Sequence, residues 1–239
     1  MILFVTNRCN MGCSHCLSSC TENGYDMKSS TFENTIKFLH KINPMSIIVS
    51  GGEPTLYPGI IHILRRLNLE FRNSRVVLCS NGTFTDSEYI MEHLRNVDCI
   101  VQIMHDPHFY PLPIDLLQLS SYELFDRIIQ VNAYGRAIEN NLAVNERHTP
   151  YCLNMRSLLK HVDFISANKN REANFKFCSW SIAPNGDILL SESMLCPPVG
   201  NINDPLDVIE NNIRNFKCLN CVYAQRTIKS DPVAGAILK

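Results

Sequence analysis

Three cysteines near the N-terminus, spaced C-x-x-x-C-x-x-C, constrain this chain more than any other feature of its 239 residues. Cys9, Cys13 and Cys16 stand in a loop short enough to fold back and aim three sulfurs at one point. A four-iron cluster bound only by cysteine needs four thiolates. Three thiolates leave one iron open to a small chelating molecule, as a catalytic zinc keeps an open position. The alternative is a structural zinc site, with His15 or Cys20 as the fourth ligand.

A second motif follows the next apolar segment of the chain. Residues 47–49 read as a short buried strand that ends in the run Ser50-Gly51-Gly52-Glu53-Pro54. The two glycines allow the backbone to approach a ligand closely, and the residue before a proline is held extended. A zinc site at the first motif does not account for this second one.

The two motifs together resemble the signature of the radical S-adenosylmethionine (AdoMet) superfamily. The resemblance implies that the first three cysteines hold a [4Fe–4S] cluster whose open iron binds AdoMet. It also implies reductive cleavage of AdoMet to methionine and a 5′-deoxyadenosyl radical, which removes a hydrogen atom from the substrate. The methionyl amino group is then expected to contact the strand-end backbone at Gly51, Gly52, Glu53 and Pro54.

Short apolar segments alternate with helical patterns over the first 140 residues, which is typical of the α/β class. We expect strands at 2–6, 45–49, 75–79, 99–104 and 127–131, and helices that begin near Ser29, Pro58 and Asp86. Repeated βα units imply a parallel sheet with right-handed crossovers. The resemblance narrows this to a partial, TIM-like (β/α)6 barrel. We expect a barrel core over 1–140, a connector completing the barrel over 141–174, and a small module over 175–239.

Three further AdoMet contacts are expected at the C-terminal ends of the strands, where the chemistry of such barrels lies. Asn81 resembles a third-strand asparagine of the superfamily, although it also suits a simple turn before glycine. Asp106 stands where relatives carry a Ser-x-Asp sequence that touches the ribose, with Met104 in place of the serine. Arg136 can clamp the AdoMet carboxylate, or form a surface ion pair.

Two residues are the catalytic candidates for proton transfer. Asp106 is one, and His108 is the other because histidine titrates near neutral pH. His105 is a further possible proton acceptor, whereas we assign no role to the histidines elsewhere in helices and loops, His40 among them.

The C-terminal module is expected to contain a β-hairpin followed by a helix. Extended segments at 175–183 and 187–190 flank an Asn-Gly pair, which is a strong hairpin signal, and Pro205 opens a helical pattern. Four cysteines frame these elements and can hold a zinc ion or a second cluster: Cys178, Cys196, Cys218 and Cys221. Their arrangement resembles twitch, the shortened SPASM module that carries an auxiliary [4Fe–4S] cluster.

Four other cysteines lie outside both ligand sets. Cys79 and Cys99 stand in apolar strands and are expected to be small core residues. Cys20 and Cys152 have polar sequence neighbours, and we interpret them as redox-active or incidental.

Composition limits the classes of function. A formal net charge of -1 gives no reason to expect a nucleic-acid or acidic-membrane surface. No apolar run approaches the ~20 residues that span a bilayer, and the N-terminus lacks a signal-peptide pattern, which favours the cytoplasm.

The resemblance implies an oxidoreductase that oxidises or cross-links a peptide during natural-product maturation, with the auxiliary cluster as electron acceptor. A flavodoxin- or ferredoxin-type protein would supply the first electron. The alternative is a dehydrogenase or epimerase of a small polar metabolite such as an aminocyclitol. A non-catalytic metal-binding protein is the alternative from a different class.

Overall fold

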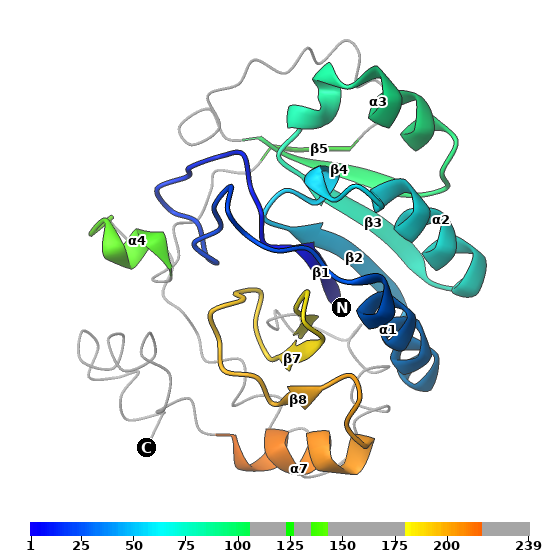
Figure 1. Cartoon of the computed structure of the whole chain (residues 1–239), viewed down its shortest axis with the longest axis vertical. Helices are drawn as coiled ribbons and strands as arrows, with labels where there is room; N and C mark the ends of the chain where they lie inside the picture. The colour runs from blue at the N-terminus through cyan, green and yellow to red at the C-terminus, as the bar shows by residue number, and fades with distance from the viewer. Residues whose placement is uncertain (106–122, 127–134, 143–179, 217–239) are drawn as a thin grey trace. The chain divides into compact units, whose positions relative to one another are not determined.

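A computed structural model describes residues 1–105, 123–126, 135–142 and 180–216 (Figure 1). The chain divides into two compact units by its internal contacts. The first unit contains Met1–Cys13, Cys20–Ile129 and Ala183–Asn185, and the second contains Ser14–Ser19, Gln130–Ile182 and Gly186–Lys239. The boundary between the units therefore falls inside the cysteine motif, between Cys13 and Ser14. The domain boundaries expected after residues 140 and 174 stay predictions.

The first unit is built on five parallel strands in the order β5-β4-β3-β2-β1. The strands are β1 (Ile2–Thr6), β2 (Ser46–Gly51), β3 (Arg75–Ser80), β4 (Ile100–His105) and β5 (Glu123–Asp126). A row of aligned apolar side chains crosses the sheet and is almost completely buried: Leu3, Val49, Leu78 and Val101. Four strands lie where the sequence predicts them, within two residues. The expected fifth strand at 127–131 lies outside the described residues, and β5 ends immediately before it.

Helices α1 (Ser29–Ile42), α2 (Ile60–Glu70) and α3 (Glu88–Arg95) lie along one side of this sheet (Figure 1). Each helix turns an apolar stripe toward the strands, as the sequence pattern predicts. These stripes include buried side chains of every helix: Phe32, Ile36, Phe38 and Leu39 of α1, Ile60, Ile61, Ile63, Leu64 and Leu67 of α2, and Met91 and Leu94 of α3.

The predicted helix starts were less accurate than the predicted faces. The N-cap of α1 is Lys28, so Ser29 is already helical, and α2 begins two residues after Pro58. The N-cap of α3 is Ser87 rather than Asp86, because the Ser87 hydroxyl accepts a hydrogen bond from the amide of Ile90. Adjacent polar residues offer alternative caps, and the tertiary path of the chain selects between them.

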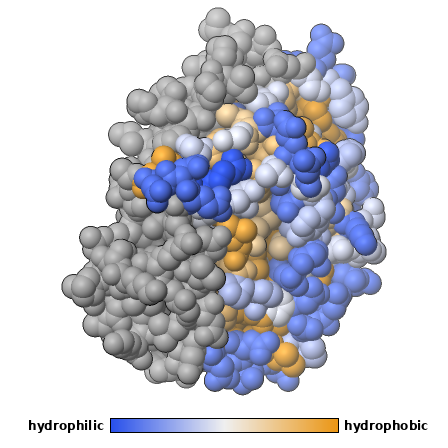
Figure 2. Space-filling model, turned by 60° about the vertical axis from the view of Figure 1, so that its left-hand side comes forward, coloured by the Kyte–Doolittle hydropathy of each residue, from blue (hydrophilic) through white to orange (hydrophobic). Residues whose placement is uncertain are grey.

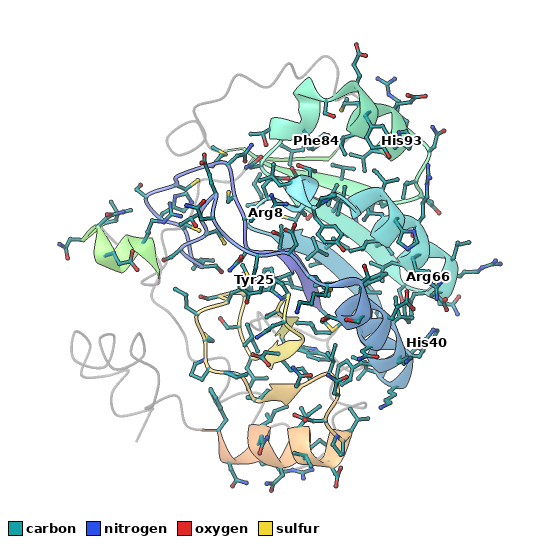
Figure 3. The ribbon with its side chains drawn as sticks, in the orientation of Figure 1. Arg8, Tyr25, His40, Arg66, Phe84 and His93 are labelled. Carbon is teal, nitrogen blue, oxygen red and sulfur yellow. The ribbon has the colours of Figure 1, made fainter. Side chains whose placement is uncertain are left out.

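The outward faces of the helices are polar. Figure 2 shows hydrophilic side chains over most of its right-hand surface and apolar ones over a narrower central area. His40 of α1 and Arg66 of α2, both labelled in Figure 3, contact Glu70 at 3.0 Å each. The Arg66 contact is a surface ion pair, of the kind that contributes little to stability, and the His40 contact is a hydrogen bond at the surface. Within the described residues, no helix is long and apolar enough to cross a membrane.

The second unit contains a small antiparallel sheet and two described helices. Strands β6 (Ser181–Ile182) and β7 (Asp187–Leu189) form the expected hairpin, and β8 (Gly200–Asn201) pairs with β7. Gly186 has a φ of +90°, a value that glycine adopts readily and that this turn requires. Helix α7 (Leu206–Asn215) follows Pro205 as predicted, and α4 (Arg136–Glu139) is a single turn. Trp180, Ile188, Ile209 and Ile213 are buried here.

Candidate functional site

The first part of the cysteine motif leaves the end of β1 and is held by backbone hydrogen bonds. Cys9 is only 8% exposed, and its amide donates to the carbonyl oxygen of Thr21 at 2.9 Å. The Cys9 sulfur in turn accepts a hydrogen bond from the amide of Met11, with an N–S distance of 3.4 Å. Hydrogen bonds to cysteine sulfur help set the properties of iron–sulfur sites. The environment of Cys9 therefore suits a thiolate ligand.

The glycine motif at the end of β2 packs directly against this loop. The amide of Gly52 donates to the carbonyl of Thr6 at 3.0 Å, and the amide of Glu53 donates to the carbonyl of Arg8 at 2.7 Å. A Cβ atom on Gly52 would lie 2.2 Å from the Arg8 oxygen and 2.9 Å from Cβ of Cys9. The missing side chain of Gly52 thus allows the glycine motif to pack closely against the cysteine loop. Approach to a ligand stays a prediction.

The Glu53 side chain connects the ends of β2 and β3 from a fully buried position. Its Oε1 accepts hydrogen bonds from the Thr55 amide at 3.0 Å, from the Thr55 hydroxyl at 2.6 Å and from the Ser80 hydroxyl at 2.8 Å. Its Oε2 accepts from the Asn81 amide at 2.8 Å. Burial raises the pKa of Glu53 above its ordinary value, and these four donors oppose that rise. The Glu53 side chain therefore binds amide and hydroxyl groups of the protein itself.

Asn81 connects the end of β3 to the cysteine motif. Its Nδ2 donates to Oδ1 of Asn10 at 3.2 Å, and Nδ2 of Asn10 donates to the Thr83 hydroxyl at 2.9 Å. Its Oδ1 accepts from the amide of Thr83 at 2.9 Å and from its hydroxyl at 2.8 Å. The sequence allowed Asn81 to be an AdoMet contact or a simple turn residue before glycine, and its hydrogen bonds to Thr83 are those of a turn asparagine. Contact with AdoMet stays a prediction.

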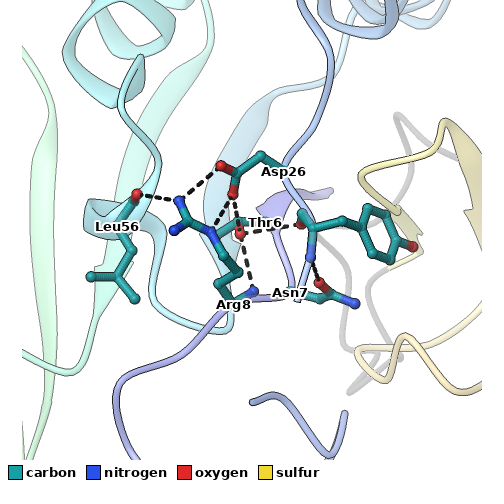
Figure 4. A network of polar contacts seen from close by, with 6 residues as sticks. Thr6, Asn7, Arg8, Asp26 and Leu56 are labelled. Atoms are coloured by element: carbon teal, nitrogen blue, oxygen red, sulfur yellow. Dashed lines mark hydrogen bonds and ion pairs between the residues drawn. The ribbon is translucent and has the colours of Figure 1, made fainter. Parts of the chain in front are cut away.

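An ion pair at the base of the loop was not anticipated from the sequence (Figure 4). The Arg8 guanidinium binds both carboxylate oxygens of Asp26, at 2.9 and 2.8 Å, and also donates to the carbonyl of Leu56 at 2.7 Å. The Thr6 hydroxyl donates to the same carboxylate at 2.6 Å. Bidentate pairs of this kind fix geometry as well as adding energy. The pair joins residues 18 positions apart, so no local pattern in the sequence signals it.

The second unit holds the rest of the motif through the turn that begins α4. The carbonyl of Cys16 accepts a hydrogen bond from the amide of Arg136 at 3.0 Å, and Asn140 donates to the carbonyl of Ser14 at 2.9 Å. Gly135 has a φ of +51°, and a Cβ atom there would lie 2.3 Å from the Cys16 oxygen. The backbone of Arg136 thus supports the cysteine loop. Its role as a carboxylate clamp stays a prediction.

The remaining predicted ligands divide between described and undescribed residues. Cys196 is half-buried in the second unit, and its amide donates to the carbonyl of Ser193 at 3.2 Å. The other predicted site residues lie outside the described part of the chain: Asp106, His108, Cys178, Cys218 and Cys221. Within the described part, no three His, Cys, Asp or Glu side chains gather closely enough to hold a single metal ion. The cluster sites therefore stay predictions from thiolate chemistry and spacing.

Two cysteines outside the ligand sets are buried or half-buried. Cys20 is only 4% exposed, and its interpretation as redox-active or incidental stays a prediction. The segment after Cys20 runs beside the start of the cysteine loop, with a bridge between Thr21 and Arg8. Cys99 is half-buried, and burial together with the charge of Asp98 raises its pKa to about 11. That pKa keeps the Cys99 thiol protonated and unreactive.

Both motifs of the site lie within a segment that matches one family model. Residues 3–111 match the model of the radical SAM superfamily. This segment is similar to radical SAM domains. It begins in β1 and contains the cysteine motif, the GGEP run and the Asn81 turn.

Curated relatives align with only part of the chain. An uncharacterised protein of Methanocaldococcus jannaschii is 34% identical over 110 residues, which are 44% of this chain and 38% of that protein. An S-adenosylmethionine-dependent nucleotide dehydratase of a Thermoplasmatales archaeon is 38% identical over 56 residues, 23% of this chain and 20% of the dehydratase. The matched part of the chain thus spans well under half of either relative.

Solved structures resemble the fold over nearly the whole chain. BtrN in complex with AdoMet and 2-DOIA has a TM-score of 0.57 at 13% identity, covering 94% of this chain and 88% of BtrN. SuiB of Streptococcus suis, bound to S-adenosylmethionine, has a TM-score of 0.53 at 14% identity, covering 93% of this chain and 70% of SuiB. The predicted α/β fold class, an open partial barrel, is confirmed.

Proposed function

We propose that this protein is a radical SAM enzyme that binds AdoMet at a [4Fe–4S] cluster held by Cys9, Cys13 and Cys16. The observation that carries the proposal is the pair of backbone hydrogen bonds from Gly52 and Glu53 to the start of the cysteine loop. They hold the GGEP strand end beside the Cys9 sulfur, which already accepts a hydrogen bond from an amide. The domain match over residues 3–111 supports the same assignment.

Each part of the described site has a role in this proposal. The three thiolates would hold the cluster, and the backbone of the GGEP run would position the methionyl end of AdoMet. When bound, the cluster supplies an electron that cleaves AdoMet and yields a radical able to remove hydrogen from the substrate. Glu53 links the ends of β2 and β3 beside the loop, so that the backbone groups proposed to face the cofactor keep their positions.

We propose further that the tail carries an auxiliary [4Fe–4S] cluster on Cys178, Cys196, Cys218 and Cys221. Four thiolates saturate such a cluster, so it would accept the electron left on the substrate radical instead of binding the substrate. The reaction would then be an oxidation or cross-linking of a peptide. SuiB has been solved bound to its precursor peptide SuiA, and its fold covers 93% of this chain, which supports a peptide substrate. A flavodoxin- or ferredoxin-type protein would donate the first electron.

The AdoMet site is tested by removing its thiolates. The variant Cys9→Ala/Cys13→Ala/Cys16→Ala should form no 5′-deoxyadenosine from AdoMet under anaerobic reducing conditions, measured by chromatography after reconstitution with iron and sulfide. The control is Cys99→Ala, which removes a protonated thiol outside the proposed ligand sets and should retain AdoMet cleavage. Native rates of 5′-deoxyadenosine formation by the triple variant would refute the proposal.

A further inference from the structure

Ser193 makes an unusual set of contacts for a serine three residues before a proposed cluster ligand. Its side chain is 2% exposed, and its hydroxyl donates to the carbonyl of Leu17 at 2.8 Å. The same hydroxyl accepts from the amide of Leu195 at 3.2 Å. Leu17 directly follows Cys16, so the last cysteine of the motif is one residue from this contact. All of these residues belong to the second unit.

A second hydrogen bond joins the same two segments of the chain. The amide of Met194 donates to the hydroxyl of Ser18 at 3.0 Å. The carbonyl of Ser193 accepts from the amide of Cys196 at 3.2 Å. Ser193 and Met194 thus bind the two residues that follow Cys16, and Ser193 also binds the backbone of Cys196.

Two more buried serines hold Ser193 in place. The Ser191 hydroxyl accepts from the amide of Ser193 at 3.0 Å, and the Ser181 hydroxyl donates to the carbonyl of Ser191 at 2.6 Å. Ser181 and Ser191 are 0% and 5% exposed. Buried polar groups lose water when the chain folds, so each needs a partner within the protein. This connected series therefore holds the backbone of Ser193, and the amide of Leu195 occupies the accepting side of its hydroxyl, which donates to Leu17.

The segment 14–19 is held from another side as well. The amide of Arg136 donates to the Cys16 carbonyl, and Ser19 donates to a carboxylate oxygen of Glu139 at 3.4 Å. With the position of Cys16 fixed relative to α4, the Ser193 contact sets where Cys196 lies relative to Cys16.

We propose that Ser193 is a positioning residue that couples the Cys16 end of the first cluster loop to Cys196, so that the two thiolates are placed together. The cluster roles of Cys16 and Cys196 rest on the proposed function, but the coupling itself is a property of the polypeptide. Removing the Ser193 hydroxyl should release both segments, although they lie more than 170 residues apart in the sequence.

Hydrogen–deuterium exchange of the metal-free protein tests the coupling without any cluster. Ser193→Ala should increase exchange severalfold in peptides covering 14–19 as well as in those covering 193–196. Ser18→Ala should have the reciprocal effect and speed exchange at 193–196. The control is Ser87→Ala, which removes the cap of α3 in the first unit and should leave both segments unchanged. Faster exchange confined to the mutated segment in both variants would overturn the proposal.

A spectroscopic measurement on the reconstituted protein then separates this inference from the proposed function. Ser193→Ala should alter the electron paramagnetic resonance signal of the reduced first cluster, whereas Ser87→Ala should leave it unchanged. A signal that Ser193→Ala leaves unchanged, despite coupled exchange in the metal-free protein, would overturn the claim that Ser193 places the Cys16 thiolate. If wild-type protein binds iron only at the first motif, the auxiliary cluster fails while the exchange result still decides the coupling.

Discussion

At the scale of single residues, the carboxylate of Glu53 holds several parts of the candidate site together through its hydrogen bonds. Four donors from three residues converge on its two oxygens: Thr55, Ser80 and Asn81. A carboxylate accepts at both oxygens, whereas an amide must present two N–H donors on one side. The four donors therefore suit a carboxylate, with two accepting oxygens, better than an amide, which would turn its N–H groups toward at least one of them.

Replacing Glu53 with glutamine should destabilise the protein by about 1–3 kcal/mol, because donors that now share a carboxylate would face the amide N–H groups. The measurement is chemical denaturation followed by circular dichroism at neutral pH. Glu33→Gln is the matched control, since Glu33 is half exposed and makes only a 3.7 Å ion pair with Arg66. Equal effects of the two substitutions would contradict the assigned role.

The pH dependence of this difference has a definite sign. Folding raises the pKa of Glu53 above 4.5 because burial disfavours its charge, so the folded state binds the proton more tightly than the unfolded state. The stability that Glu53 contributes is therefore greatest at low pH. It falls as the pH rises from about 4.5 through the raised pKa. The stability advantage of wild type over Glu53→Gln should shrink across that window and then level off.

At the scale of elements, the end of β2 and the start of the cysteine loop form one packed unit. Two amides of the glycine motif bind carbonyls of Thr6 and Arg8, and the Arg8 side chain reaches Asp26 and Leu56. The parallel pairing of β1 with β2 brings the two motifs together at the same edge of the sheet. Their close packing then depends on the missing side chain of Gly52.

Gly52→Ala should separate the strand end from the loop, because its Cβ atom would lie 2.2 Å from a backbone oxygen that cannot move aside easily. We expect a loss of about 2 kcal/mol or more, as for overpacked cores, measured as a lower denaturation midpoint of metal-free protein. Gly12→Ala, in the cysteine motif, is the control, since a Cβ atom there meets nothing within 4 Å. A stable Gly52→Ala protein would show that the packing is looser than the structure indicates.

At the scale of the whole molecule, the question is how many clusters one chain holds. Seven cysteines are proposed as ligands, three in the first motif and four in the tail, and the thiolate count suits one open and one saturated four-iron cluster. Zinc also binds four thiolates, so the metal in the tail has to be measured directly.

Anaerobically reconstituted protein should contain about eight irons and eight sulfides per chain, as two four-iron clusters require. Elemental analysis together with a sulfide assay measures both. The triple variant lacking Cys9, Cys13 and Cys16 serves as the control and should retain about four irons. Tightly bound zinc beside only four irons in the wild type would contradict the auxiliary cluster.

The sequence alone determined those features that depend on local pattern. Alternating apolar segments located four of the five strands and the buried faces of three helices, because burial of a face repeats with the period of the element. The Asn-Gly pair located the hairpin at Gly186, because few residues adopt its positive φ. The spacing of Cys9, Cys13 and Cys16 identified the candidate cluster loop for a similar reason, since those ligands are neighbours in the chain.

The tertiary structure decided which distant groups meet. Nothing near Arg8 in the sequence points to Asp26, and nothing near Ser193 points to Leu17, 176 residues away. Such contacts depend on how the folded backbone brings separate segments together, and a single side chain carries no periodic signal of that event.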